Sequence, residues 1–487
     1  MMHIDPMVRS AAAATSQVKR KSNQERADLL REIANEIEGL GDELLETASA
    51  ESNLPLVRFQ GERARTCGQL RMFAATIEEG SYQEPSIDTT QLERKPLPKP
   101  DLRSLLIPVG PIVVFGASNF PLAYSTAGGD TASALAAGCA VICKAHPAHP
   151  RTSEMVAGAI QRALKKCNFP PAFFSHWVAR DFDEVKALVQ HPLVKGVGFT
   201  GSLSGGMAIH KYAQERQEPI PVFAEMGSVN PVILLPNALV DKAGHWAETY
   251  ASAITMGVGQ FCTNPGLLFA IEGEALQHFV SLLSAHLLNI RDYKMLHPGI
   301  HDNFVKRKEM VLGTKGVKAM AVVSASGEHT GTPVLALVDA EDFRNHATLH
   351  EEVFGPFSMV VACKDRDDLM SCLDVLQGQL TSTLIATPED DEDVKSLLPI
   401  LNEKAGRIIY NGVPTGVEVC DAMVHGGPFP ATTDARFTAV GNKAIRRWLR
   451  PVAFQNCPQN LLPAILQDKN PTAAWRNING QLTKADV

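Results

Sequence analysis

The sequence predicts an α/β protein with two parallel sheets flanked by helices and a small β arm beside them. Apolar strands alternate with helical segments from Ile107 to about residue 214, and a second alternating series starts near Asn230. Residues 83–105 are instead rich in Pro and Lys, which indicates an extended arm or an edge strand. The length of 487 residues is sufficient for two or three domains.

Composition and charge exclude several classes of partner. The apolar share of 45% and the charged share of 20% are ordinary for a globular protein. The net charge of -7 gives no electrostatic basis for binding nucleic acid or an anionic membrane. No apolar run approaches the length of a membrane span, and the N-terminus lacks the charged start and long apolar region of a secretory signal. We therefore expect neither nucleic acid nor a membrane as a partner.

The nine cysteines are an odd number without paired spacing, which fits a reducing cytoplasm. Cys139 and Cys143 are four residues apart, but no second Cys or His pair completes a zinc set. Both are therefore predicted to lie in a buried strand, and no metal site is expected.

The first elements follow from periodicity and from proline. Apolar residues recur at helical spacing through residues 24–50, and residues 62–78 continue the pattern. From Ile107 the sequence I-P-V-G-P-I-V-V-F-G is an apolar strand. A helix is expected to open at Asn119, because Pro121 then lies near the helix start, where proline is favoured.

The rest of the first series alternates regularly. The predicted strands are 139–144, 173–178 and 194–199, and the predicted helices run from a Thr152 cap to about 167, over 183–189, and from T-G-S-L-S-G-G to about 214. A parallel sheet with helices on both faces is an architecture that binds dinucleotides at the carboxyl ends of its strands.

The second series is similar in style. Its strands are expected near Leu267, Ala319, Val334, 382–386 and 407–410, and its helices near 365–376 and 390–401. The tail after about residue 445 mixes Arg with apolar residues and ends in a polar stretch that we expect to be loosely held.

Polar groups follow several of the predicted strands. Asn119 comes directly after one strand, Lys144 ends another, and Glu225 lies just past a third. Gly201, Ser202 and Gly206 form a glycine-rich turn at a helix start, which suits an anion because free N–H groups and the helix dipole converge there. Taken singly, Asn119 could also be an N-cap, Lys144 a solvated strand end and Glu225 a surface acid. The glycines could also form only a tight turn.

Cys262 lies in G-V-G-Q-F-C-T-N-P-G, among glycines that let the backbone approach another group. Taken alone it could be a small buried hydrophobe. The motifs F-T-G-S, E-M-G-S-V-N-P, G-Q-F-C-T and E-E-V-F-G-P occur in this order, and the chain from about 25 to 460 resembles the aldehyde dehydrogenase superfamily.

The resemblance implies a role for each matching residue. Cys262 would be the nucleophile, because a thiolate adds readily to a carbonyl. The Asn119 amide and the Cys262 backbone N–H would stabilise the oxyanion, and Glu225 would activate water to hydrolyse a thioester. Glu352 would hold the nicotinamide ribose. Lys144 and Ser202, with the turn of Gly201 and Gly206, would contact the adenosine ribose and the pyrophosphate.

The resemblance also implies a domain division and an oligomer. The dinucleotide-binding domain would comprise residues 1–90 and 108–228, and the catalytic domain 229–444. An oligomerisation arm would comprise 91–107 and 445–465, followed by a C-terminal tail over 466–487. A homodimer or homotetramer is expected on this basis.

The sequence departs from the family pattern at Pro147. In NAD-preferring members an acid commonly stands three residues after the lysine, where it would repel a 2′-phosphate. Pro147 removes that repulsion, so NADP is the expected cofactor, with NAD still allowed. Arg180 is a candidate phosphate partner; the alternative is a solvated loop charge.

The C-terminal half, including N-G-V-P-T-G-V-E-V-C-D-A-M-V-H-G-G-P-F-P-A-T-T-D-A-R, resembles the 2,5-dioxovalerate (α-ketoglutarate semialdehyde) dehydrogenases of bacteria. A carboxylate on the substrate needs a cation, and Arg65 is the candidate, with Arg436 as its rival. The alternative is that Arg65 pairs with Glu62 on a solvated helix face. The substrate-binding set is completed by Phe120, Tyr124 and Phe261.

Three other functions compete with this interpretation. The first is oxidation of a medium-chain, fatty or aromatic aldehyde by an NADP-linked relative. The second is an acylating enzyme that transfers the acyl group to coenzyme A, which Glu225 disfavours because a hydrolytic base would waste the thioester. The third is a non-catalytic scaffold, which has no need of Asn119, Glu225, Cys262 and Glu352 together.

Overall fold

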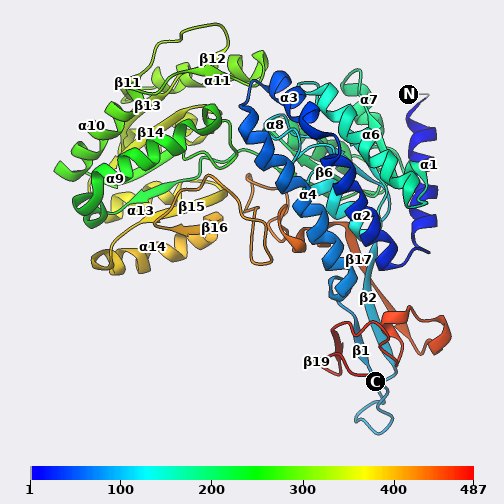
Figure 1. Ribbon diagram of the computed structural model, residues 1–487. Helices are drawn as coiled ribbons and strands as arrows, with labels where there is room; N and C mark the ends of the chain where they lie inside the picture. The colour runs from blue at the N-terminus through cyan, green and yellow to red at the C-terminus, as the bar shows by residue number, and fades with distance from the viewer. Residues whose placement is uncertain (1–2) are drawn as a thin grey trace.

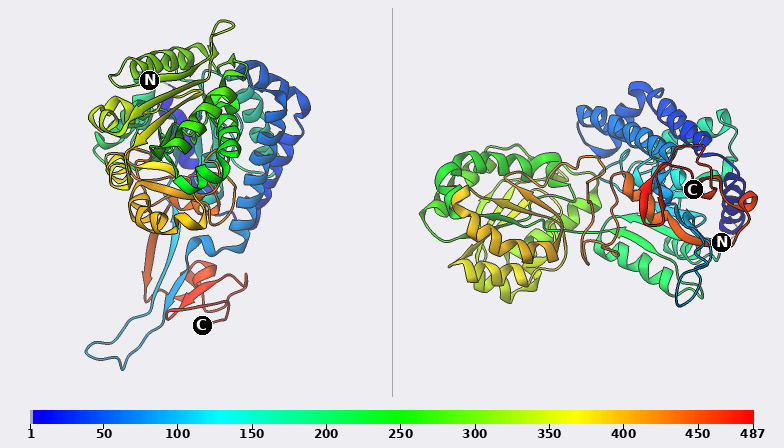
Figure 2. Two further views of the ribbon diagram at one scale, coloured as in Figure 1. Left: turned by 90° about the vertical axis from the view of Figure 1, so that its left-hand side faces the viewer. Right: turned by 90° about the horizontal axis from the view of Figure 1, so that it is seen from below.

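A computed structural model describes residues 3–487 and shows two α/β lobes with a narrow arm projecting from one of them (Figures 1 and 2). The first lobe carries the N-terminal helices and a five-stranded sheet, and the second carries a seven-stranded sheet. No helix among the described residues is long and apolar enough to cross a membrane.

The N-terminal helices are α1 (Ile4–Val18), α2 (Asn23–Glu38), α3 (Gly41–Ser52) and α4 (Leu56–Glu79). Helix α1 is an element that was not predicted from the sequence. The expected helix over 24–50 is two helices, because the chain bends at Gly39 and Leu40, and Gly41 takes a φ of +63°. A capping box between Ser22 and Glu25 starts α2. Helix α2 packs along α4 (Figure 1).

The sheet of the first lobe is parallel, as predicted. Its strands, in the order β5-β4-β3-β6-β7, are β5 (Phe174–Trp177), β4 (Val141–Lys144), β3 (Ile112–Phe115), β6 (Gly196–Thr200) and β7 (Val222–Glu225). The helices between them are α5 (Gly129–Ala137), α6 (Pro150–Lys166), α7 (Phe182–Val189) and α8 (Leu203–Gln214). The strand order reverses at β3, so a crevice for ligands is expected at the carboxyl ends of β3 and β6.

Two local predictions in this lobe are wrong. The helix expected to open at Asn119 begins only at Gly129, because the buried Glu62 carboxylate accepts the backbone N–H groups of Leu122 and Ala123 at 2.8 and 3.0 Å. Thr152 does not cap α6. Its hydroxyl donates to Glu51, whose carboxylate also accepts two backbone N–H groups at the start of that helix.

The second alternating series is confirmed as a seven-stranded sheet. Its order is β11 (Lys318–Val322), β13 (Val334–Asp339), β14 (Phe357–Cys363), β9 (Leu267–Ile271), β8 (Val232–Leu234), β15 (Gln379–Ile385) and β16 (Ala405–Tyr410). Only β11 is antiparallel to its neighbour. The covering helices are α9 (Pro236–Thr255), α10 (Glu274–Leu288), α11 (Pro298–Leu312), α12 (Ala340–Asn345), α13 (Arg366–Asp374) and α14 (Asp391–Lys404). A short ribbon pairs β10 (Tyr293–Lys294) with β12 (Thr330–Gly331).

The arm is a third sheet. Its order is β17 (Leu449–Gln455), β2 (Leu102–Pro108), β1 (Ser86–Asp88), β18 (Arg476–Ile478) and β19 (Gln481–Thr483), and the loop between β1 and β2 forms its tip (Figure 2). The extended stretch predicted from prolines is therefore confirmed. The prediction of a loosely held C-terminal tail is wrong. Strand β18 pairs with β1, and the fully buried Arg476 donates to the carbonyls of Gln467 and Ala485.

Candidate active site

Cys262 lies in the loop that enters β9, and glycine fixes the course of this loop. Gly259 has a φ of +66°, and a Cβ there would fall 2.2 Å from the backbone of Gly355. The segment that carries Cys262 is thus packed against the predicted E-E-V-F-G-P motif. Asn230 donates its amide to the carbonyl oxygens of Cys262 and Asn264, both at 2.9 Å. The position of Cys262 is therefore set from two sides.

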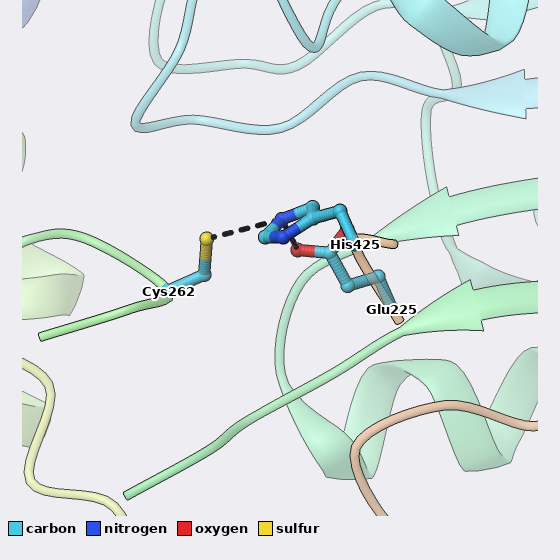
Figure 3. A group of neighbouring side chains, drawn as sticks. All are labelled: Glu225, Cys262 and His425. Atoms are coloured by element: carbon cyan, nitrogen blue, oxygen red, sulfur yellow. Dashed lines mark hydrogen bonds and ion pairs between the residues drawn. The ribbon is translucent and has the colours of Figure 1, made fainter. Parts of the chain in front are cut away.

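The thiol of Cys262 faces His425 and Glu225 (Figure 3). His425 Nε2 lies 3.6 Å from the Cys262 sulfur and 3.0 Å from Glu225 Oε1. Glu225 ends β7 in the first lobe, whereas His425 follows β16 of the second lobe, so the group joins the two lobes. Both side chains are almost fully buried, with 4% and 1% of their surface exposed.

The surroundings of Cys262 disfavour its thiolate. Desolvation raises the pKa of the thiol well above its usual range, and the carboxylates of Glu225 and Glu352 raise it further. Cys262 is consequently a neutral thiol until a neighbour takes its proton. His425 Nε2 is placed to do so at 3.6 Å.

Sequence reasoning missed His425. The residue belongs to D-A-M-V-H-G-G-P, a stretch in which only the resemblance to 2,5-dioxovalerate dehydrogenases was noticed. A histidine next to two glycines was the available signal, but its partners are distant in the sequence. His425 is held by its backbone N–H, which donates to the Thr438 hydroxyl at 2.9 Å.

Asn119 contacts the loop that carries the Cys262 thiol. Its side-chain amide donates to the carbonyl of Gln260 at 3.1 Å, and its own carbonyl accepts from Arg58 of α4 at 2.5 Å. The Asn119 amide is therefore held at Gln260, which is two residues before Cys262 in the sequence. An Nδ2–H group at this place can serve an oxyanion that forms on the cysteine.

A cavity of about 460 Å³ brings most of the predicted residues together. Asn119, Glu225, Cys262 and Glu352 line it, as do Lys144, Gly201 and Ser202. Glu225 and Glu352 are the only acids in its lining among residues 3–487. Lys144 ends β4, and desolvation lowers its pKa.

Ser202 and Gly206 have different parts in the glycine-rich turn. Ser202 caps α8, because its hydroxyl oxygen accepts the Gly205 N–H at 3.2 Å. Gly206 does not line the cavity; a Cβ there would lie 2.5 Å from the sulfur of Met226, so this glycine lets α8 pack closely.

Arg180, the candidate phosphate partner, also lies outside the lining of the cavity. Its exposed side chain pairs with Glu184, with Nε donating at 2.7 Å.

Glu352 approaches the backbone at the start of the second lobe. A Cβ on Gly227 would fall 2.8 Å from its Oε2, so only glycine allows this approach. Desolvation raises the pKa of Glu352 to about 8, against the opposing effect of a hydrogen bond from the Ser228 N–H.

An aromatic cluster of Phe120, Tyr124 and Phe261 adjoins Asn119 and Cys262. Phe120 makes edge contacts with Tyr124 and Phe261, at centroid distances of 5.2 and 5.4 Å. The guanidinium of Arg58 lies 4.6 Å from the Phe120 centroid, and that of Arg65 lies 5.5 Å from the Tyr124 centroid. Two cations from one face of α4 thus border the cluster.

Arg65 does not pair with Glu62, so that alternative is wrong. Its terminal nitrogens donate to the Val417 carbonyl at 2.8 Å and the Tyr124 hydroxyl at 3.1 Å. Glu62 is buried and lies 3.6 Å from Arg58 instead. The rival anchor Arg436 is 82% exposed and pairs with Asp434, outside the cavity.

Comparisons with known proteins define the class. The model of the aldehyde dehydrogenase family matches residues 1–427, so the chain belongs to this family. It is 49% identical over 457 residues to alpha-ketoglutaric semialdehyde dehydrogenase 2 of Azospirillum brasilense, covering 94% of this chain and 87% of that protein. It is 46% identical over 488 residues to alpha-ketoglutaric semialdehyde dehydrogenase of Acinetobacter baylyi, covering 99% and 91%.

Solved structures show the same fold at low identity. The structure of a 3,6-anhydro-L-galactose dehydrogenase in complex with NAP matches with a TM-score of 0.79 at 18% identity, over 93% of this chain and 91% of that one. The glyceraldehyde-3-phosphate dehydrogenase of Methanocaldococcus jannaschii in complex with NADP matches with a TM-score of 0.78 at 19% identity, over 93% and 94%.

Proposed function

We propose that this aldehyde dehydrogenase oxidises 2,5-dioxovalerate to 2-oxoglutarate with NADP, through a thioester on Cys262. The observation that carries the chemistry is the contact of His425 Nε2 with both the Cys262 sulfur and the Glu225 carboxylate, next to the Asn119 amide. Asn119, Glu225 and Cys262 line one cavity, and His425 contacts the last two of them.

The first step is removal of the thiol proton. His425 Nε2 accepts it, and the resulting Nε2–H is then directed to the Glu225 carboxylate at 3.0 Å. The carboxylate stabilises the imidazolium, and the imidazolium stabilises the thiolate. This arrangement offsets the high pKa of the buried thiol.

The thiolate sulfur adds to the aldehyde carbon, and the Asn119 amide and the Cys262 N–H donate to the new oxyanion. Bound NAD(P) supplies the hydride acceptor for the oxidation. Glu225 takes a proton from the water that then cleaves the thioester, which releases the acid, and the departing thiolate recovers its proton from His425 Nε2. His425 keeps the carboxylate beside the sulfur throughout.

The cavity has the features that a dinucleotide requires. Lys144 and the start of α8 line the same cavity as Cys262 and Glu352. The two lining acids of the described residues, Glu225 and Glu352, both act on Cys262, because their charges raise the pKa of its thiol. Pro147, three residues after Lys144, is exposed. These features support NADP, with NAD as the alternative.

The names of the relatives and the two arginines of α4 support a substrate that carries a carboxylate. The aromatic cluster would equally accept an apolar chain, which favours a medium-chain or fatty aldehyde as the second candidate. Steady-state kcat/KM across an aldehyde panel with both cofactors tests the choice. Cys262→Ala should abolish turnover and retain cofactor binding; turnover in this variant would contradict the mechanism.

The same proposal includes the domain roles and the oligomer. Residues 1–90 and 108–228 would bind the dinucleotide, 229–444 would carry catalysis, and the arm would join copies of the chain. Edge strand β17 and the exposed Leu92 and Leu97 near the arm tip support self-association. All nine cysteines are free, which supports a reducing cytoplasm. Sedimentation of wild type against an arm-tip Leu92→Lys variant tests the oligomer.

A further inference from the structure

We propose that Cys262, His425 and Glu225 also form a zinc site, which reversibly blocks the enzyme when Zn²⁺ occupies it. One ligand atom from each residue lies within 4.8 Å of the others. The set of one sulfur, one imidazole nitrogen and one carboxylate oxygen matches the ligand types of zinc. Figure 3 shows the three side chains pointing toward one another.

The spacing of the ligand atoms fits a tetrahedral ion. With Zn–S of about 2.3 Å and Zn–N of about 2.05 Å, tetrahedral geometry separates sulfur and nitrogen by roughly 3.6 Å. The Cys262 sulfur and His425 Nε2 lie 3.6 Å apart. Nitrogen and oxygen ligands would lie roughly 3.4 Å apart, and His425 Nε2 and Glu225 Oε1 are at 3.0 Å, so a small side-chain rotation is sufficient.

Burial and backbone support hold the three residues ready for an ion. Glu225 Oε2 is buried and has no hydrogen-bond partner within residues 3–487, which is costly for a carboxylate that is 4% exposed. The Glu225 carbonyl accepts from the Gly201 N–H, and the His425 carbonyl from the Ala439 N–H. Ligands fixed in this way lose little entropy on binding a metal.

Zinc has a route to the site and an open position once there. Cys262 and Glu225 line the 460 Å³ cavity, and three protein ligands leave a fourth position for water. On binding, the S–H bond breaks, the proton passes to solvent, and bonds form from zinc to sulfur, nitrogen and oxygen, without any redox change. The sulfur is then unable to add to an aldehyde. Lys144 and Ser202, which also line the cavity, are not among the ligands of the ion.

The test is metal binding to the metal-free full-length protein, followed without turnover. Titration with Zn²⁺ should show one tight equivalent, and Co²⁺ should give a thiolate-to-cobalt charge-transfer band. Cys262→Ser and His425→Gln should each weaken binding at least tenfold and remove the band. Zn²⁺ should also slow the alkylation of Cys262. In a separate turnover assay, Zn²⁺ should inhibit competitively with the aldehyde, and a chelator should reverse the inhibition. Mg²⁺ should have no effect in either assay.

A second cluster provides the matched control. His301, Asp302 and His329 also lie within ligand distance of one another, but they are far more exposed. His301→Ala should leave the tight equivalent and the cobalt band unchanged. Loss of the tight equivalent in His301→Ala, or its survival in both Cys262→Ser and His425→Gln, would overturn the proposal. Cofactor binding by each variant shows that it is folded, so these outcomes do not depend on the aldehyde oxidised.

Discussion

The imidazole of His425 contacts the carboxylate of Glu225 at 3.0 Å, although the two residues come from different lobes. This ion pair joins the two lobes next to the Cys262 sulfur, which lies 3.6 Å from the same imidazole nitrogen. The chemistry is therefore coupled to the fold, because any change in how the lobes meet separates the Glu225 carboxylate from His425 and Cys262.

The first prediction concerns His425. Because the pKa of the Cys262 thiol is raised, loss of the neighbouring base should leave it protonated at neutral pH. His425→Gln should lower the rate of Cys262 alkylation at pH 7 by at least about tenfold, and the rate should recover as the pH rises toward the thiol pKa. The control His301→Gln, at a half-buried histidine outside the cavity, should behave as wild type. An unchanged alkylation rate and pH profile would remove His425 from proton transfer.

The second prediction separates the two half-reactions. Glutamine at position 225 keeps the shape of the side chain but cannot take a proton from water. Glu225→Gln should therefore give a burst of reduced cofactor and then a steady state slower by about a hundredfold. Rapid mixing with absorbance detection measures both phases. A normal steady-state rate without a burst would show that another group activates the water.

The sequence was informative where a function depends on short local motifs. Cys262 and Asn119 follow a glycine turn and a strand, Glu225 ends a strand, and all three line one cavity together with Glu352. Gly206 also belonged to a motif, yet it serves packing against Met226. Local pattern identifies a turn, but it does not say which member of the turn touches a ligand.

Prediction failed where distant segments decide the outcome. His425 becomes part of the site only because the second lobe folds back onto β7. The helix expected at Asn119 is delayed by Glu62 of α4, a buried carboxylate that takes two backbone N–H groups. Neither partner lies near its target in the sequence, so periodicity and capping rules could not indicate them.

The third prediction is a pH dependence of stability. The pKa of Glu352 is about 8 in the folded protein and about 4.5 unfolded, so the folded state holds a proton that the unfolded state releases between these values. Wild type should therefore lose stability relative to Glu352→Gln as the pH rises from 5 to 8. The melting temperature of the variant should exceed that of wild type increasingly, by about 2 °C or more at pH 8.

Thermal unfolding without cofactor measures this difference. Glu351→Gln is the matched control, because that carboxylate is 62% exposed and pairs with Arg307 at the surface. Its difference from wild type should not change with pH. A constant difference for Glu352→Gln would mean that Glu352 is already ionised in the folded protein at pH 5.

The fourth prediction is cofactor preference. Wild type should use NADP at least as well as NAD, because Lys144 lines the cavity and Pro147 stands where an acid would repel the 2′-phosphate. Pro147→Glu should lower kcat/KM for NADP by about tenfold and leave NAD nearly unchanged. Arg180→Gln tests the second cation, and a loss for NADP alone would assign it to the phosphate. A wild type that uses only NAD would contradict the prediction.

The last prediction distinguishes recognition of the substrate from positioning of Asn119. Arg65 and Arg58 lie seven residues apart on α4 and border the same aromatic cluster, but they have different contacts. Arg65 donates to the Tyr124 hydroxyl and the Val417 carbonyl at the border of that cluster. Arg58 donates to the backbone carbonyl of Asn119.

Arg65→Met should therefore raise KM for 2,5-dioxovalerate by about tenfold, equivalent to about 1.4 kcal/mol of lost binding, and spare an uncharged aldehyde of similar length. Arg58→Met should instead lower kcat for both aldehydes, because the oxyanion donor loses its support. Equal losses on both substrates in Arg65→Met would make Arg65 a structural residue, and a loss confined to the charged substrate in Arg58→Met would transfer the carboxylate to Arg58.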